Sequence, residues 1–299
     1  MCASGLLLQP GLLWPALVER SRHALACGAM LTIETDEEIV PDEGVDFVVR
    51  RVSSLARKRD AGERRSEAAP ANPFLPHEPD LFVAEVSDTH FALLNKFNVI
   101  ENHLLLVTRR FVHQETLLDG ADFAALAACM GELDSLGFYN GGVVAGASQP
   151  HKHLQLVPLP LARTGLPLPM EALFAHALGR TGVTRVPGLA FAHAFAWMEP
   201  AWLDAGDVGE RLRALYLELM AAAGIESVRV HGEERQSAPY NLLLTRRWML
   251  LAPRSRERFG SISVNALGFA GSLFVRDAEQ MALVRRAGPM AVLCGVSVV

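Results

Sequence analysis

Residues 139–158, YNGGVVAGASQPHKHLQLVP, decide the fold that we expect for this chain. They hold a glycine-rich turn and then the alternating run 151–156, HKHLQL. In a strand, successive side chains point to opposite faces. The two histidines and the glutamine therefore share one face, and the two leucines share the other with the stem of Lys152. Burial of the apolar face would fix the register and direct the polar face toward a cleft.

This polar face suits chemistry on a phosphate. An imidazole titrates near neutral pH, so it can attack as a neutral nucleophile and later depart. A glycine-rich turn can bring backbone N–H groups close to anionic oxygens. A glutamine can donate hydrogen bonds without acting as an acid. The spacing alone leaves two alternatives open, an ordinary polar strand face and a metal site.

Composition bounds the class of protein. The 299 residues are half apolar and carry a formal net charge of -5, so we expect no nucleic-acid partner. No apolar run approaches the length of a membrane span and the N-terminus lacks a basic region, so we expect neither a membrane partner nor a secretory signal. The sequence has no C-x-x-C pair, and free thiols fit a cytoplasmic location. The cysteines are Cys2, Cys27, Cys129 and Cys294.

Lysine is rare in this chain. Of the 28 basic residues, Lys58, Lys96 and Lys152 are the lysines. We assign a functional role to Lys96 and to Lys58, because a compact point charge can be selected where arginine is otherwise preferred. Lys58 begins the Arg-, Glu- and Pro-rich segment 55–72, which reads as an exposed loop.

Periodicity predicts strands in runs, with helices between the runs. The predicted helices are residues 12–27, 119–136 with Gly137 as the stop, 170–178, 208–223 and 277–287. The predicted strands are residues 81–86, 90–97, 103–108, 151–156, 189–198, 227–230, 240–244 and 248–252. Asn95 and Lys96 end one strand and can face a ligand or solvent. Cys129 and His193 are expected to be structural.

These elements predict an α+β fold with a mainly antiparallel sheet and flanking helices. We expect one domain over residues 1–299. Residues 1–185 would form its N-terminal catalytic portion, and residues 186–299 a C-terminal portion that completes the sheet and the substrate pocket.

The run H-x-H-x-Q is the signature of the transferase branch of the histidine-triad superfamily. The longer string GASQPHKHLQ resembles the diadenosine tetraphosphate (Ap4A) phosphorylases, also called ATP adenylyltransferases. Other stretches resemble that family in the same order, from about residue 46 to about residue 292 with gaps. They are NPFLPHEPDLFVAEVSDTHFALLNKFNVIENHLLLVT, PYNLLLTRRWMLLAPR and SVNALGFAGSLFVR. The resemblance implies a histidine-triad-like fold.

The resemblance also implies adenylyl transfer through a covalent intermediate. His153 would attack the α-phosphorus of Ap4A and expel ATP, and phosphate would then release the bound AMP as ADP. In reverse, ATP and ADP would give Ap4A and phosphate. His151 would orient His153 or its adduct, and Gln155 would hold the non-bridging oxygens.

Position in the motifs implies a set of substrate contacts. They are Lys58, Asn95, Lys96, Asn140, Gly146, Ala147, Ser148, Gln149, Asn265, Ala266, Leu267, Ser272 and Arg276. Family members commonly carry lysine where Arg276 stands and methionine where Ser272 stands. These two differences bear on hydrogen-bond geometry and on base or chain-length preference, and leave the implied reaction unchanged.

The implied partners are small molecules: Ap4A, ATP, ADP and phosphate. We expect no tightly bound cofactor and no metal ligands, although Mg²⁺ can accompany the polyphosphate. The rival enzymes are a uridylyltransferase or a nucleotide-sugar phosphorylase that shares H-x-H-x-Q. The rival from another class is a catalytically inactive nucleotide-binding module.

Overall fold

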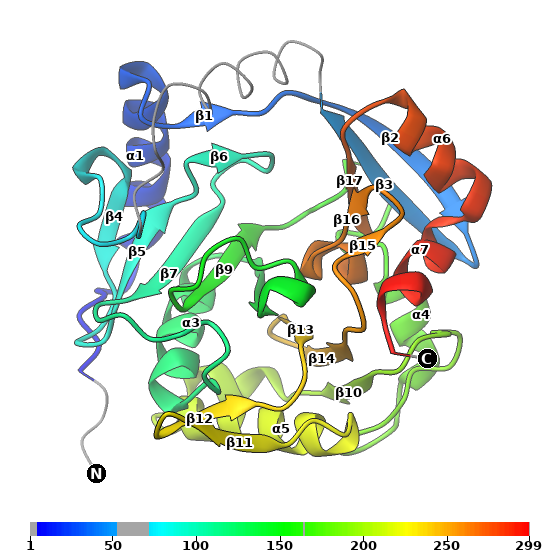
Figure 1. Ribbon diagram of the computed structural model, residues 1–299. Helices are drawn as coiled ribbons and strands as arrows, with labels where there is room; N and C mark the ends of the chain where they lie inside the picture. Colours follow the sequence, from blue (N-terminus) through cyan, green and yellow to red (C-terminus); the bar gives the residue numbers. More distant parts are fainter. Residues whose placement is uncertain (1–4, 53–71, 164, 299) are drawn as a thin grey trace.

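The computed structural model describes residues 5–52, 72–163 and 165–298 (Figure 1). The α-helices are α1 (Leu13–Cys27), α3 (Gly120–Glu132), α4 (Glu171–Phe174), α5 (Val208–Ala222), α6 (Ala278–Ala287) and α7 (Pro289–Val296). The 3-10 helices are η1 (Pro79–Leu81), η2 (Val143–Ala145), η3 (Ala175–Ala177), η4 (Pro200–Asp204) and η5 (Ala266–Ala270).

Strands make up most of the remaining regular structure. The strands are β1 (Leu31–Thr32), β2 (Thr35–Asp42), β3 (Val45–Val52), β4 (Phe82–Glu85), β5 (His90–Leu94), β6 (Phe97–Asn98), β7 (Leu104–Thr108), β8 (Ser135–Gly141), β9 (His153–Pro158), β10 (Ala194–Trp197), β11 (Ser227–Val230), β12 (Glu233–Gln236), β13 (Tyr240–Leu244), β14 (Trp248–Pro253), β15 (Arg258–Phe259), β16 (Ile262–Ser263) and β17 (Ser272–Val275).

One sheet of eight strands, in the order β10-β14-β13-β8-β9-β7-β5-β4, forms the centre of the fold. Every neighbouring pair in it is antiparallel. Five of these strands come from residues 1–185 and three from residues 186–299. The expected α+β fold with a mainly antiparallel sheet is therefore confirmed, and β8 and β9 lie at its middle.

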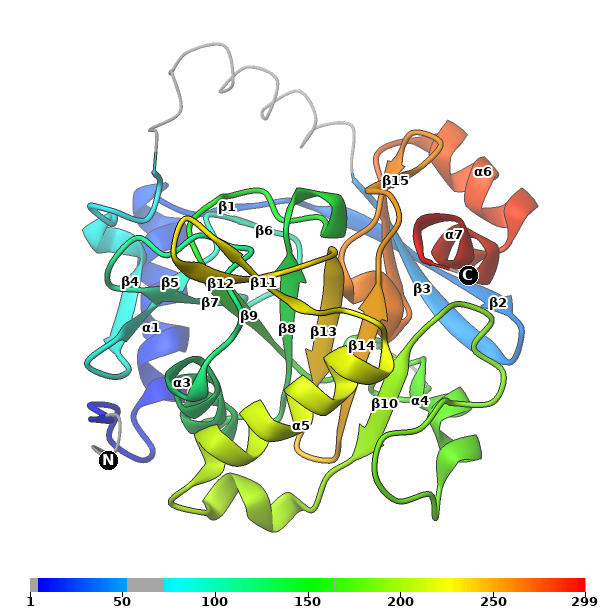
Figure 2. The ribbon, with the colours of Figure 1, turned by 60° about the horizontal axis from the view of Figure 1, so that its bottom comes forward.

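The two faces of this sheet are covered differently. Helices α3 and α5 cross one face, with α1 beside them (Figure 2), and a first apolar core lies beneath them. The opposite face packs partly against a smaller sheet, β17-β3-β2, which α6 and α7 cover in turn. That second core contains Phe138 and Val157 from the central strands. Between this core and β7 the second face carries the polar side chains of β9.

Helix α3 is shorter than the sequence predicts. It ends at Glu132, and residues 135–141 form β8, so Gly137 is a strand residue and does not stop the helix. The error arises because apolar residues three positions apart continue up to Leu136, and this spacing fits a helix. The alternation with a period of two that indicates a strand begins only at Leu136. A side chain at Gly137 would lie 3.2–3.3 Å from atoms of Leu126, Leu244 and Met130. The glycine therefore allows close contact between α3 and the sheet.

Most other expected elements are present. The predicted helices 12–27, 170–178, 208–223 and 277–287 match α1, α4 with η3, α5 and α6 within a few residues. The predicted strand 90–97 ends at Leu94, and only residues 194–197 of the predicted strand 189–198 are extended. Strands β1, β2, β3 and β12, the last helix and the short C-terminal strands were missed. No helix in the described ranges has both the length and the apolar character needed to cross a bilayer.

A buried ion pair ties Lys152, the residue directly before β9, to α3. Lys152 and Asp122 are both almost fully buried, and their charged atoms lie 2.8 Å apart. The Lys152 ammonium also donates to the Leu117 carbonyl at 2.9 Å, and the other Asp122 oxygen lies 3.0 Å from His90 Nε2. Burial alone raises the pKa of Asp122, but the nearby lysine and histidine outweigh this and lower it to about 2. The Asp122 carboxylate therefore stays charged at neutral pH.

We predict that Lys152→Met destabilises the fold by about 3–5 kcal/mol, because it leaves the Asp122 carboxylate buried without its cation. Adding Asp122→Asn should recover part of this loss, since no unpaired charge remains. Urea unfolding measures both, with the exposed pair member Arg211→Met as a control that should change little. The Asp122 contribution should be present above its usual pKa of 3.8 and be lost as pH falls toward 2. Equal stability of wild type and Lys152→Met would contradict the assignment.

Candidate active site

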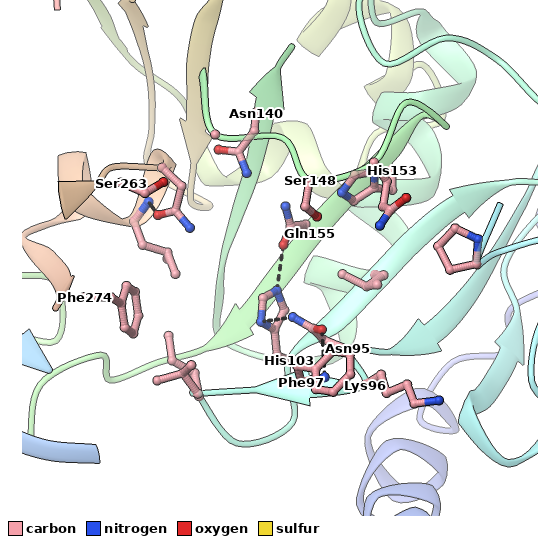
Figure 3. A pocket seen from close by; sticks show the side chains of 18 of the residues that line it. Asn95, Lys96, Phe97, His103, Asn140, Ser148, His153, Gln155, Ser263 and Phe274 are labelled. Atoms are coloured by element: carbon pink, nitrogen blue, oxygen red, sulfur yellow. Dashed lines mark hydrogen bonds between the residues drawn. The ribbon is translucent and has the colours of Figure 1, made fainter. Parts of the chain in front are cut away.

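A cavity of about 610 Å³ opens on the second face of the large sheet, above β9 (Figure 3). Its walls come from segments far apart in sequence: residues 73–81, β5 to β7, the glycine-rich turn and the C-terminal stretch 258–280. The cavity is lined by His153 and Gln155, and His151 is not among its lining residues. Of the predicted polar face, His153 and Gln155 therefore meet the cavity, whereas His151 precedes β9 and does not, and Leu154 and Leu156 lie in the core beneath α3.

The ring of His153 has a defined tautomer. Its Nδ1 lies 2.9 Å from the backbone carbonyl oxygen of His151. A carbonyl only accepts, so Nδ1 must carry the proton and Nε2 must hold a free lone pair. Burial lowers the pKa of His153 to about 4, although the bond to the His151 carbonyl opposes this shift. His153 is thus a neutral imidazole at physiological pH, as a nucleophile requires.

The side chain of His151 is occupied elsewhere. Its Nε2 lies 2.9 Å from the carbonyl oxygen of Thr108, and its Nδ1 lies 3.1 Å from the Asn72 amide nitrogen. Phe74 packs against both histidine rings, with centroids 5.7 Å and 5.2 Å away. The contact from His151 that orients His153 is therefore made by its main-chain carbonyl, while its ring anchors the start of the strand.

A chain of hydrogen bonds that sequence reasoning missed sets the orientation of Gln155. The Phe97 backbone N–H donates to Asn95 Oδ1 at 3.3 Å, which turns the Asn95 amide nitrogen toward His103 Nδ1 at 3.1 Å. His103 must then carry its proton on Nε2, which donates to Gln155 Oε1 at 2.9 Å. Figure 3 shows these side chains in a row. The Gln155 side-chain oxygen thereby accepts the His103 proton donor, and the Gln155 NH₂ group remains to donate into the cavity.

His103 belongs to this chain through the register of the sheet. Leu105 pairs with Gln155, so His103, two residues earlier, is the diagonal neighbour of Gln155 on the same face. Burial lowers the pKa of His103 to about 4, opposed by the bond to Gln155. Its only sequence signal is its place as the first residue of the predicted strand 103–108, and that signal is too common to select it.

Gln114 is a second side chain that the sequence did not reveal. Pairing of β8 with β9 extends only to Phe138 and Gln155, and the strands separate beyond that point. Gln114 fills the gap: its Oε1 accepts from the His153 N–H at 2.9 Å, and its Nε2 donates to the Asn140 carbonyl at 2.9 Å. This buried amide fixes the backbone of His153 where regular pairing stops.

The glycine-rich turn closes one side of the cavity. Gly146 has a φ of 92°, and a Cβ there would lie 2.9–3.0 Å from atoms of Asn265 and Val264. Only glycine allows this backbone conformation together with so close an approach. Directly before the turn, Asn140 of β8 contacts η5, where its Oδ1 accepts from the Ala266 N–H at 2.9 Å.

Most predicted substrate contacts come together around the cavity. Its lining includes Asn95, Lys96, Asn140, Gly146, Ser148, Gln149, Asn265, Leu267 and Arg276. Ala147, Ala266 and Ser272 do not line it, and the buried Ser272 hydroxyl accepts a hydrogen bond from Arg50 instead. Lys58 and most of the predicted loop 55–72 lie outside the described residues.

The charged groups of the cavity are mainly basic. Its described lining holds three cations, Lys96, Arg258 and Arg276, and one carboxylate, Glu78, which pairs with Lys96 at 2.7 Å. Sequence reasoning did not select Arg258. The excess of positive charge favours an anionic ligand. In the described ranges, the one cluster of three or more His, Cys, Asp or Glu side chains with metal-ligand spacing lies elsewhere, on α1 and η1.

The antiparallel sheet, the H-x-H-x-Q strand and the cationic cavity are the features expected of a nucleotidyltransferase. Family models agree: the Ap4A phosphorylase N-terminal domain matches residues 3–176, and the ATP adenylyltransferase C-terminal domain matches residues 187–299. The chain belongs to the Ap4A phosphorylase family.

Individual proteins support this placement. The chain is 29% identical over 266 residues to diadenosine 5',5'''-P1,P4-tetraphosphate phosphorylase 2 of Saccharomyces cerevisiae, covering 81% of this chain and 79% of that protein. It is 26% identical to Protein APA1 of the same yeast, covering 82% and 80%. The crystal structure of yeast Ap4A phosphorylase Apa2 superposes with a TM-score of 0.77 at 22% identity, over 97% of this chain and 95% of that one.

We predict that His153 and His103 stay neutral well below pH 6 and occupy opposite tautomers, His153 with its proton on Nδ1 and His103 on Nε2. Nitrogen NMR of histidine-labelled protein measures both properties, with assignment by single substitutions. Because burial lowers both pKa values to about 4, neither ring should titrate between pH 8 and pH 5. A His153 ring that gains a proton near pH 6.5 would contradict this description.

Proposed function

We propose that this chain catalyses the phosphorolysis of Ap4A to ATP and ADP, and the reverse synthesis, through a histidine-bound AMP. Membership of the Ap4A phosphorylase family supports the substrate, and one of the two yeast relatives carries that activity in its name. The observation that supports the mechanism best is the His153 imidazole, neutral and with a free Nε2, at the wall of a cationic cavity.

In the first step, the Nε2 lone pair of His153 attacks the α-phosphorus of Ap4A. The bond from that phosphorus to the bridging oxygen breaks, and ATP departs with the electron pair. The ring then carries the adenylyl group on Nε2 and a proton on Nδ1, so it bears a positive charge. The His151 carbonyl at 2.9 Å stabilises this charge and keeps the ring in place.

The other residues act on charge and position. The free NH₂ of Gln155 is placed to donate to a non-bridging oxygen as negative charge develops in the transition state. Lys96, Arg258 and Arg276 would hold the remaining phosphates, and Asn140 and the 146–149 turn would position the bound nucleotide. Phosphate then attacks the same phosphorus, ADP forms, and the neutral imidazole leaves.

We expect no resident metal in this mechanism, and Mg²⁺ only as a companion of the polyphosphate. The proposed partners are therefore small nucleotides and phosphate. The three cysteines in the described ranges, Cys27, Cys129 and Cys294, are free thiols. This supports the cytoplasmic location that we propose.

Product analysis tests the reaction. Ap4A should disappear only when phosphate is present and should yield ATP and ADP in equal amounts. His153→Ala should lose this activity entirely, because no other residue in the mechanism carries the adenylyl group. The variant should keep its unfolding midpoint. Formation of AMP with ATP in plain buffer would indicate a hydrolase, and wild-type turnover by His153→Ala would remove His153 from the mechanism.

We predict a smaller loss for Gln155→Ala, roughly 10²-fold in kcat, because it removes a donor that acts on transition-state charge. His103→Phe should cost about tenfold, since it frees the Gln155 amide to turn. If His103 acts through Gln155, adding His103→Phe to Gln155→Ala should cause no further loss. Additive losses in the double variant would show that His103 acts by another route.

A further inference from the structure

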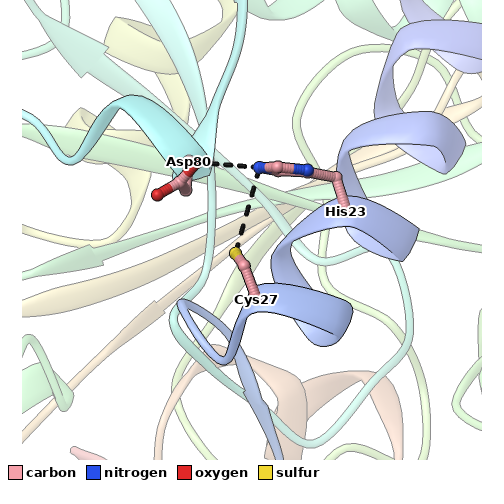
Figure 4. Close-up of side chains that lie close together, drawn as sticks. All are labelled: His23, Cys27 and Asp80. Atoms are coloured by element: carbon pink, nitrogen blue, oxygen red, sulfur yellow. Dashed lines mark hydrogen bonds and ion pairs between the residues drawn. The ribbon is translucent and has the colours of Figure 1, made fainter.

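A cluster of three side chains outside the cavity is arranged like a metal site. His23 and Cys27 are four residues apart in α1, so they share one face of the helix. Asp80 comes from η1, which packs against α1. Figure 4 shows the three side chains converging on one point. Their ligand atoms all lie within 4.8 Å of one another.

Two side chains of this cluster converge on one ring nitrogen, and the Cys27 thiol also donates to the Ala24 carbonyl at 3.6 Å. The carboxylate oxygen of Asp80 lies 2.7 Å from His23 Nε2, and the Cys27 sulfur lies 3.9 Å from the same nitrogen. One ring nitrogen carries at most one proton, so it cannot serve both neighbours. A thiol-imidazole-carboxylate relay is also excluded, because a relay uses the two different nitrogens of the ring. A cation at the shared point would satisfy all three groups at once.

The distances suit a tetrahedral ion. Zinc lies about 2.0–2.3 Å from nitrogen, oxygen and sulfur ligands, so a tetrahedral site separates nitrogen from sulfur by roughly 3.6 Å and nitrogen from oxygen by roughly 3.4 Å. The His23–Cys27 distance already fits within a few tenths of an ångström. The Asp80 carboxylate needs a small outward rotation, and its side chain, 53% exposed, has room for it.

We propose that His23, Cys27 and Asp80 bind one divalent transition-metal ion of the zinc class, with water in the fourth position. A mixed nitrogen, sulfur and oxygen set favours such an ion over Mg²⁺ or Ca²⁺. The site would cross-link α1 to η1. Glu78 and Leu81, which flank Asp80 in sequence, line the cavity, so the ion would also brace one wall of the active site.

Titration with Co²⁺ alone tests the site, because cobalt bound to a thiolate absorbs in the near ultraviolet. We expect one equivalent per chain, loss of the band in Cys27→Ser, and at least tenfold weaker binding in His23→Gln and Asp80→Asn. Zn²⁺ should displace the cobalt. All three side chains are exposed, so the variants should fold. Matched controls are Cys2→Ser, Cys294→Ser and His176→Gln, which should bind as wild type does.

A second measurement separates a cross-link from binding to the helix alone. Zn²⁺ should raise the Tm of the wild-type chain clearly more than that of Asp80→Asn, because the variant binds the ion more weakly and its two remaining ligands on one helix cannot join that helix to η1. The proposal fails if wild type shows no thiolate band, if the band survives Cys27→Ser, or if the Tm rises equally in Asp80→Asn. Neither readout depends on catalytic activity.

Discussion

The buried ion pair between Lys152 and Asp122 is the constraint on which the active site depends. The pair lies on the face of the sheet that α3 covers. The side chains of the residues before and after Lys152 lie on the opposite face. A shift of one residue in β9 would place the ammonium in the cavity and His153 in the apolar core. Such a shift would leave Asp122 without its partner. The charge pair therefore fixes which side chains of β9 face the substrate.

The protonation states of the cavity follow from main-chain groups. The carbonyl of His151 and the N–H of Phe97 each have only one possible hydrogen-bonding role, so they set the tautomers of the rings and amides that they contact. Through them His153 presents a lone pair and Gln155 presents donors. Burial keeps both His153 and His103 neutral. The chemistry is thus arranged by backbone geometry, and the positive charge of the cavity comes from lysine and arginine at its walls.

Alternation in residues 151–156 predicted the opposite faces of His153 and Gln155 and of Lys152 and the leucines, but it also placed the His151 ring in the cleft, which that ring does not line. The partner of Lys152 was not predictable, since Asp122 looks like an ordinary acid in the first turn of a helix. His103 was missed because its role arises from the register of two strands, and Gln114 because its role arises where two strands separate. Neither feature is visible in the spacing of residues along the sequence. The end of α3 was misplaced because apolar residues at spacing three precede the strand. The family resemblance, rather than periodicity, supplied the nucleotide.

The central claim is that Nε2 of His153 becomes bonded to phosphorus during turnover. Mass spectrometry of protein denatured after incubation with Ap4A, without phosphate, tests it most directly. The account predicts a gain of one adenylyl group, labile in acid, located at His153 by peptide mapping and released as ADP when phosphate is added before denaturation. Rapid phosphorolysis by a protein that never carries this group, at any time resolved by rapid quenching, would contradict the account.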